Sequence, residues 1–280
     1  MSVSLDALLK RVDISTLPTI YLRLDEAISN SQTSIAAIGG IISDDAGLST
    51  RLLKLVNSSF YGFPSRIDTI SRAVMIVGTH QLRDLALATS VMQMFEGIPE
   101  DLINMESFWK HSLACGIAAK VVCSYKNAPN KESFFVAGVL HDVGRLLMFK
   151  NIAAEYREVL GLASAEGRLT YEIERERLGF DHAAVGAHLL HLWKLPVFLE
   201  ELVACHHRPG KAVRYPLEAA ILHVADFLVN ALELGSSGER FAPRLDDSAW
   251  TLTGLPASGI PDVLSEVEGQ FSDVVTTLLG

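Results

Sequence analysis

The residues of this sequence best suited to chemistry are histidines and aspartates in its second half. Eight of the nine histidines follow residue 110, and two doublets stand out, His141-Asp142 and His206-His207. Imidazole nitrogens and carboxylate oxygens are ligands that iron, manganese, zinc and nickel take in proteins. A metal held by such ligands lowers the pKa of a coordinated water and supplies a nucleophile near neutral pH. The pattern indicates a site for one or two metal ions, and no organic cofactor is expected.

Seven residues form the candidate ligand set, each within or at the edge of a predicted helix. In chain order they are His111, His141, Asp142, His182, His206, His207 and Asp226. Asp181, beside His182, is an alternative donor at that position. A structural interpretation stays open for each residue: a core histidine paired with an aspartate, a histidine at a helix C-terminus, or a buried salt bridge.

The remaining histidines fit supporting roles. His188 and His191 lie three residues apart on one helix face, and His80 is expected in a turn or at a helix cap. His223 precedes Asp226 by three residues on the same face, so we expect it to support that aspartate from outside the ligand set.

Helical periodicity dominates the elements that must position these residues, and no segment alternates convincingly like a β-strand. Helices are expected from Leu5 to Val12, near Ile20, near Ile35, from Leu48 to Val56 and over Ile70–Val77, where Gly78 ends the segment. Further helices are expected over Phe108–Cys123, Phe134–Phe149, Ile152–Glu166, Tyr171–Leu178, His182–Leu192, Val197–Cys205, Leu217–Leu234 and near Asp262–Leu279. The doublet His141-Asp142 follows an apolar run and precedes Gly144, which indicates a buried helix end.

These elements predict an all-α, two-lobed protein in which short connections make neighbouring helices antiparallel. We expect an amino-terminal helical lobe over residues 1–98 and a helical lobe carrying the candidate ligands over 99–234. Residues 235–280 are expected to form a loop and a last helix that pack on the same domain.

The composition excludes several classes of protein. With 24 basic and 33 acidic residues the formal charge is −9, which excludes a uniformly basic nucleic-acid binder. The chain is 49% hydrophobic, which excludes wholesale disorder, and no apolar run approaches the roughly 18 residues that span a bilayer. The amino terminus lacks the features of a signal peptide, and the three cysteines fit reduced thiols in a cytoplasmic protein.

The order of the histidines and aspartates resembles the HD superfamily of metal-dependent phosphohydrolases. His111, His141-Asp142 and Asp226 match its four-ligand pattern, and His182 with His206-His207 extends the match to the two-metal HD-GYP branch. That resemblance implies one ion on the first set, a second ion on the added histidines, and Asp142 between them.

The amino-terminal half resembles the HDOD family, the HD-related output domain. Its hallmark segments correspond to ISDDAGLSTRLLKLVNSSFYG over 42–62 and IDTISRAVMIVG over 67–78, and the match extends over residues 17–234. HDOD proteins are bacterial, helical and associated with signal transduction. The resemblance therefore implies an HD-like core in the carboxy-terminal lobe, with a retained or a vestigial metal site, and a regulatory module that binds a signalling protein or a nucleotide-like ligand. A homo-oligomer is compatible with it, and neither DNA nor a membrane is expected as a partner.

The competing interpretation is an active metal-dependent phosphohydrolase or phosphodiesterase. Asp142 and Arg145 would then be its catalytic residues, with Arg145 or Lys211 steadying the phosphate oxygens. The sequence leans away from it, because Arg145 replaces the lysine of the HD-GYP branch and arginine donates a proton poorly. The glycine-rich GYP loop of that branch is also replaced, by residues 208–216.

Two features of the amino-terminal half invite alternatives. The segment Asn57–Gly62 fits a helix end packed by aromatic side chains, and a docking surface between lobes or for a partner is the other interpretation. Short helices separated by turns superficially suggest helix-turn-helix DNA binding. The best candidate for a recognition helix, Leu48–Val56, carries only two basic residues, Arg51 and Lys54. These are too few for sequence recognition in a DNA groove.

Overall fold

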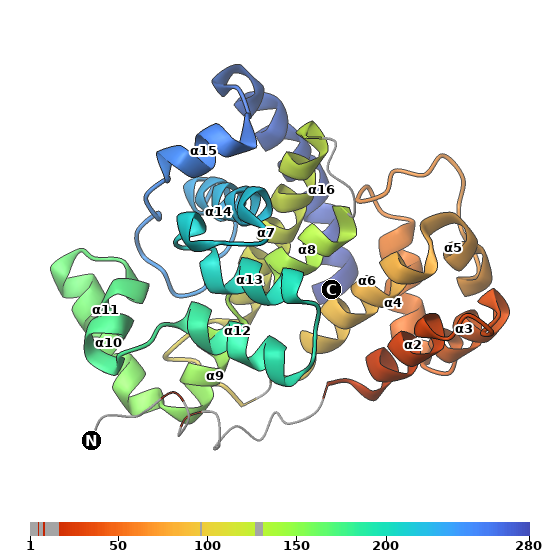
Figure 1. Ribbon diagram of the computed structural model, residues 1–280, viewed down its shortest axis with the longest axis horizontal. Coiled ribbons are helices and arrows are strands. Elements are labelled where there is room, and N and C mark those ends of the chain that lie inside the picture. Colours follow the sequence, from red (N-terminus) through yellow and green to blue (C-terminus); the bar gives the residue numbers. More distant parts are fainter. Residues whose placement is uncertain (1–4, 6–7, 9–16, 96, 127–130) are drawn as a thin grey trace. The chain divides into compact units, whose positions relative to one another are not determined.

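The computed structural model describes residues 5, 8, 17–95, 97–126 and 131–280 of the chain. It confirms the all-α prediction, because none of these residues lies in a β-strand (Figure 1). The helix expected from Leu5 to Val12 falls largely outside the described residues. No described helix combines the length and the apolar character that a membrane span requires.

The contacts of the described residues group them into two units. Residues 17–94 and 265–280 form the amino-terminal unit, and residues 95–264 form the histidine-rich unit. The expected segments 1–98, 99–234 and 235–280 stay a prediction as domains. In the structure, residues 235–264 group with the histidine-rich unit and residues 265–280 with the amino-terminal unit.

The amino-terminal unit consists of short helices with local stop signals. These are α2 (Thr19–Ser29), α3 (Ile35–Ser43), α4 (Ala46–Val56), α5 (Ile70–Val77), α6 (Thr79–Val91) and the end of α16 (Ile260–Leu279). Ser34 caps α3 by accepting from Ala37 N at 3.1 Å, and Asp45 caps α4 by accepting from Leu48 N at 2.8 Å. Gly78 separates α5 from α6 at a φ of 103°, which glycine adopts without strain.

The histidine-rich unit is built around a long buried helix. Its elements are α7 (Met105–Tyr125), α8 (Lys131–Leu140), α9 (Val143–Asn151), α10 (Ala153–Glu166), α11 (Thr170–Leu178), α12 (His182–Leu192), α13 (Val197–Cys205), α14 (Pro216–Ala231), α15 (Asp247–Thr253) and the 3-10 turns η1 (Pro209–Lys211) and η2 (Ala257–Gly259). Helix α7 packs against α8 and α14, while α12 packs against α9 and α13. Helices α9 and α12 approach so closely that a Cβ on Gly144 would collide with His182 O and Gly186 N.

The expectation of one continuous helix over Phe134–Phe149 is wrong. The chain instead forms α8 and α9, with His141 and Asp142 between them. The Nδ1 of His141 donates a hydrogen bond to Gly138 O at 2.7 Å, so the side chain satisfies a backbone carbonyl near the end of α8. The new helix begins at once, as Arg145 N donates to Asp142 O at 2.9 Å. The doublet His141-Asp142 therefore lies at a buried helix end, as its position before Gly144 indicated.

Candidate metal centre

Five parts of the histidine-rich unit bring the predicted ligands to one place. Helix α7 carries His111, the α8–α9 break carries His141 and Asp142, α12 begins with His182, α13 is followed by His206 and His207, and α14 carries Asp226. Their ligand atoms fall into two adjacent groups. Residues that are spread over more than a hundred positions of the sequence therefore lie close together in the fold.

The first donor group consists of His111, Cys115, His141 and Asp226, whose ligand atoms lie within 4.8 Å of one another. Asp226 Oδ1 lies 3.3 Å from His111 Nε2 and 3.8 Å from His141 Nε2. None of the four side chains is more than 5% exposed, so water contributes little to their solvation. Three of the four belong to the predicted ligand set, and Cys115 does not.

The second donor group consists of Asp142, His182, His206 and His207. Asp142 Oδ1 lies 3.0 Å from His182 Nε2 and 3.7 Å from His206 Nε2. The Nε2 atoms of His182 and His207 are 2.7 Å apart. His207 is partly exposed and stacks on the ring of Tyr171, with centroids 4.4 Å apart.

Asp142 joins the two groups through its two oxygens. Its Oδ2 lies 3.2 Å from His141 Nε2, and its Oδ1 lies 3.0 Å from His182 Nε2. Burial disfavours the charged carboxylate, but Arg145, His141 and His182 outweigh burial and hold the pKa of Asp142 well below its usual value. An ionised carboxylate placed in this way can serve two metal ions at once.

The rings of His141 and His206 are oriented by backbone carbonyls. Each Nδ1 donates to a carbonyl, to Gly138 O in His141 and to Val203 O in His206, both at 2.7 Å. Their Nε2 atoms face inward, and both are buried without a hydrogen-bond partner among the described residues. Leaving a buried polar atom unpaired is costly, whereas a metal ion satisfies such a nitrogen. The donor set therefore fits a metal.

His182 is held differently, by a carboxylate. Glu174 Oε2 accepts from His182 N at 2.8 Å and lies 2.7 Å from His182 Nδ1, while the hydroxyl of Tyr156 donates to Glu174 Oε1. Burial and Arg145 lower the pKa of His182, but Glu174 and Asp142 outweigh them and raise it to about 9. In contrast, burial and His141 lower the pKa of His206 to about 3. One ring of this group is thus protonated near neutral pH, and another is ready to bind a metal.

Arg145 is buried and already engaged by two carboxylates. Its Nε donates to Asp142 Oδ1 at 3.2 Å, and its Nη2 donates to Glu239 Oε2 at 3.5 Å. Glu239 also accepts from Thr170 N at 3.0 Å. A cavity of about 470 Å³ adjoins this pair, and its lining includes Glu239, Thr170, Arg240 and Phe241.

Comparison with known protein families identifies the family of this chain. The sequence profile of the HDOD domain matches residues 14–209, which is most of the chain. This chain belongs to the HDOD domain family. The predicted resemblance is therefore confirmed.

Solved structures share the fold of this HDOD domain over nearly its whole length. A protein from Shewanella amazonensis SB2B named "Putative phosphohydrolase" is 25% identical, with a TM-score of 0.76 and 97% of each chain covered. An HDOD domain protein of unknown function from Geobacter sulfurreducens is 23% identical, with a TM-score of 0.76, 98% of this chain and 95% of that one covered. An uncharacterized protein of Treponema pallidum is 27% identical over 70% of this chain, and the match spans only 38% of that relative's length.

The structure also decides between the alternatives for single residues. Asp181 caps α12 by accepting from Ala184 N at 2.9 Å and pairs with Arg175, so His182 and not Asp181 faces the second group of this HDOD domain. His223 lies outside both groups, and its hydrogen bonds do not go to Asp226 as expected: its Nδ1 donates to His206 O at 2.7 Å and its Nε2 accepts from Asp246 N at 3.0 Å. His188, His191 and His80 take no part in either group, and His80 lies in the first turn of α6, not in a turn between helices.

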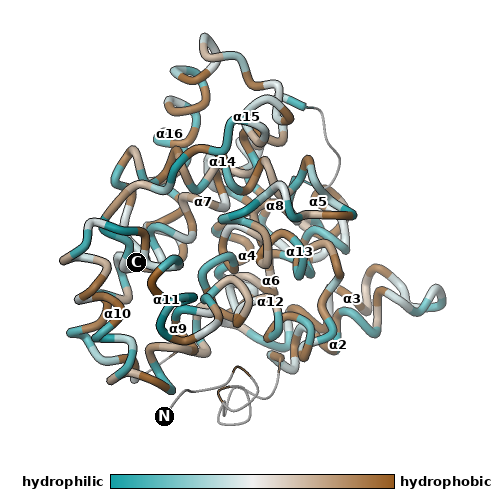
Figure 2. Tube along the Cα trace, turned by 60° about the vertical axis from the view of Figure 1, so that its left-hand side comes forward, coloured by the Kyte–Doolittle hydropathy of each residue, from teal (hydrophilic) through white to brown (hydrophobic). Residues whose placement is uncertain are grey.

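Three residues of the centre were missed by the sequence prediction. Cys115 follows His111 by four positions, a spacing that places both on one helix face, and this signal was available. Glu174 lies in α11, a helix of largely hydrophilic residues (Figure 2). Its charged neighbours in the sequence conceal the fact that Glu174 alone among them is buried. Glu239 comes from a loop after α14, and nothing in its sequence neighbourhood indicates a partner in α9.

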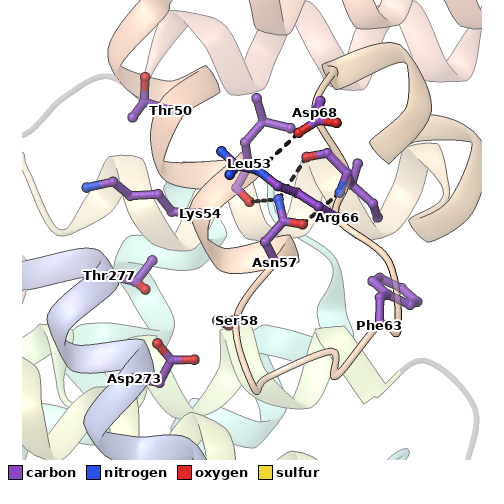
Figure 3. Close-up of a pocket in the computed structure, with 11 residues that line it drawn as sticks. Thr50, Leu53, Lys54, Asn57, Ser58, Phe63, Arg66, Asp68, Asp273 and Thr277 are labelled. Carbon is purple, nitrogen blue, oxygen red and sulfur yellow. Dashed lines mark hydrogen bonds and ion pairs between the residues drawn. The ribbon is translucent and has the colours of Figure 1, made fainter.

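The segment Asn57–Gly62 has a structural role in the amino-terminal unit. The side-chain amide of Asn57 donates to Leu53 O and Ile67 O, and its oxygen accepts from Ile67 N at 2.7 Å. These bonds tie the end of α4 to the segment that leads into α5. Asn57 and Ser58 also line a cavity of about 700 Å³ together with Lys54 and Asp273 (Figure 3). The docking interpretation of this segment stays a prediction.

Proposed function

We propose that this HDOD domain is a regulatory module of signal transduction that holds a two-metal centre in its histidine-rich unit. The observation that carries the proposal is the placement of Asp142, with one oxygen toward each donor group. Iron, manganese, zinc and nickel all accept nitrogen and carboxylate ligands of this kind. When bound, such ions supply positive charge that binds and polarises phosphate oxygens.

Access to the centre favours regulation over catalysis. The side chains of His111, His141, Asp142, His182, His206 and Asp226 are at most 5% exposed. The Arg145 guanidinium, which a phosphate would need, is buried, and its Nε and Nη2 already contact Asp142 and Glu239, while its Nη1 has no hydrogen-bond partner among the described residues. A substrate phosphate has to reach both the ions and this guanidinium, and the observed arrangement opposes both.

The signal would come from a signalling protein or a nucleotide-like ligand, and we place the module in the cytoplasm. The cavity beside Glu239 offers such a ligand both Arg240 for a phosphate and Phe241 for a ring. Glu239 contacts Arg145, and Arg145 contacts Asp142. Occupation of the cavity would therefore act on the carboxylate shared by the two donor groups.

A second candidate function is metal-dependent phosphohydrolysis. It is favoured by the convergence of the complete HD-type ligand set and by the similarity to the Shewanella protein. In that case Asp142 would position the ions, and Arg145, once released by Glu239, would bind the phosphate.

The experiment that separates the two candidates combines metal analysis with a turnover assay. The purified chain and its Asp142→Asn variant are analysed for bound transition metals and assayed on a panel of nucleotides and phosphodiesters. Asp44→Asn, which removes an exposed ion pair with Arg23 in the amino-terminal unit, is the matched control. Stoichiometric metal that is lost in Asp142→Asn, with no turnover on the panel, supports the regulatory module. Turnover that Asp142→Asn abolishes supports the hydrolase, and the absence of metal from the wild type contradicts both.

A further inference from the structure

We infer that Cys115 is a ligand of the first metal position, and that its thiolate makes this position select zinc-like ions over manganese. The inference rests on the proposed metal centre and adds to it a donor that the HD pattern does not contain. Cys115 lies one helical turn after His111 on α7, so both side chains leave the helix on the same face.

The distances around Cys115 correspond to the edges of a tetrahedron. Its Sγ lies 3.6 Å from His111 Nε2 and 3.7 Å from Asp226 Oδ1, and the latter two atoms are 3.3 Å apart. In a tetrahedral zinc site, bonds of about 2.0 Å to nitrogen or oxygen and about 2.3 Å to sulfur give edges of about 3.5 Å from sulfur to either other ligand and about 3.3 Å between nitrogen and oxygen. The three atoms thus stand where three ligands of one ion would stand.

A separate observation points to the same position. The Nε2 of His141 is buried and makes no hydrogen bond among the described residues, although it lies 3.2 Å from Asp142 Oδ2 and 3.8 Å from Asp226 Oδ1. A thiol that only donates to Asp226 would account for the placement of Cys115 and would leave this nitrogen unsatisfied. An ion bound by Cys115, His111, His141 and Asp226 satisfies all four, and the thiol proton is released to solvent when it binds.

The donor sets of the two groups predict different metal preferences. Thiolate is a soft ligand that favours zinc, whereas carboxylate and water suit manganese. The second group, of Asp142 and three histidines, contains no sulfur. A spectroscopic signal from a metal–thiolate bond would therefore report on the first group alone.

Cobalt(II) provides the test, because it substitutes for zinc and absorbs strongly in the near ultraviolet when a thiolate is bound. The chain of 280 residues is loaded with cobalt under anaerobic conditions. The charge-transfer band should appear in the wild type and vanish in Cys115→Ser, while the visible d–d bands remain. Cys123→Ser and Cys205→Ser, which change buried thiols outside both donor groups, should keep the band. Zinc affinity should fall roughly tenfold or more in Cys115→Ser, with a smaller change for manganese.

The outcomes separate this inference from the proposed function. Cobalt bound by the wild type without the near-ultraviolet band would overturn the role of Cys115 and leave the metal centre intact. A wild-type protein that binds no cobalt would overturn the metal centre and the inference together. The wild-type spectrum decides the question even if Cys115→Ser fails to fold, and persistence of the band in a folded Cys115→Ser would also refute it.

Discussion

The Glu174 carboxylate lies 2.7 Å from His182 Nδ1, and both side chains are fully buried. With Asp142, it raises the pKa of His182 to about 9. A metal can bind this ring only after the proton leaves, so metal affinity of the second group should fall about tenfold per pH unit below about 9. Titrations of the chain with zinc between pH 6.5 and 9.5 measure this dependence.

Replacing Glu174 tests the cause of that pH dependence. In Glu174→Gln the negative charge is absent, the pKa of His182 falls, and the pH dependence should weaken over the same range. Glu172→Gln, on the same helix but half-exposed and paired with Arg168, should behave as wild type. Identical pH profiles for Glu174→Gln and the wild type would contradict the assignment of the proton to His182.

Removal of Glu239 should make Arg145 available to phosphate. Glu239 Oε2 faces the guanidinium at 3.5 Å and borders the 470 Å³ cavity, so Glu239→Ala opens a path from the cavity to Arg145. We expect inorganic phosphate to bind Glu239→Ala several-fold more tightly than wild type, as measured by calorimetry.

The double variant Glu239→Ala/Arg145→Met supplies the control for that experiment, because it opens the same path without the guanidinium. The gain in phosphate binding should disappear in it. A gain that persists in the double variant would place the phosphate elsewhere, and Glu268→Gln on the exposed face of α16 should show no gain at all.

The sequence was sufficient for the fold class and for seven of the side chains that meet in the two donor groups, but not for Cys115 or for how these side chains are held. Periodicity and the glycine at position 78 predicted α5 and its end, because those signals are local. The order of His111, Asp142 and Asp226 predicted their convergence through the family resemblance. The split between α8 and α9 depends on the bond from the His141 ring to Gly138 O, and Glu239 reaches Arg145 across 94 positions. Contacts of that kind produce no periodic pattern of residues in a sequence, so the sequence alone does not predict them.

The side chain of Asn57 should stabilise the amino-terminal unit without affecting the metal centre. It makes hydrogen bonds to Leu53 O and to both backbone groups of Ile67, which is buried. Asn57→Ala leaves the Ile67 groups unpaired, and we expect a loss of about 1–3 kcal/mol in the free energy of unfolding. Urea denaturation measures the loss, and metal content should stay at the wild-type level. Asn30→Ala, at an exposed helix end, should cost much less. Equal losses in the two variants would refute the structural role of Asn57.

The close approach of α9 and α12 at Gly144 should be required for the second donor group. A Cβ at this position would collide with His182 O and Gly186 N, and backbone atoms cannot move aside as a flexible side chain would. Gly144→Ala should therefore separate the two helices, destabilise the protein by about 1–3 kcal/mol, and reduce the metal bound by the group that contains His182. Gly161→Ala on α10 is the matched control, because its Cβ would meet no atom within 4 Å and alanine favours a helix by about 1 kcal/mol. Urea denaturation and metal analysis of both variants check the prediction. A Gly144→Ala protein with wild-type stability and full metal content would show that the contact between α9 and α12 accommodates a Cβ. The packing of these helices would then not be what positions His182.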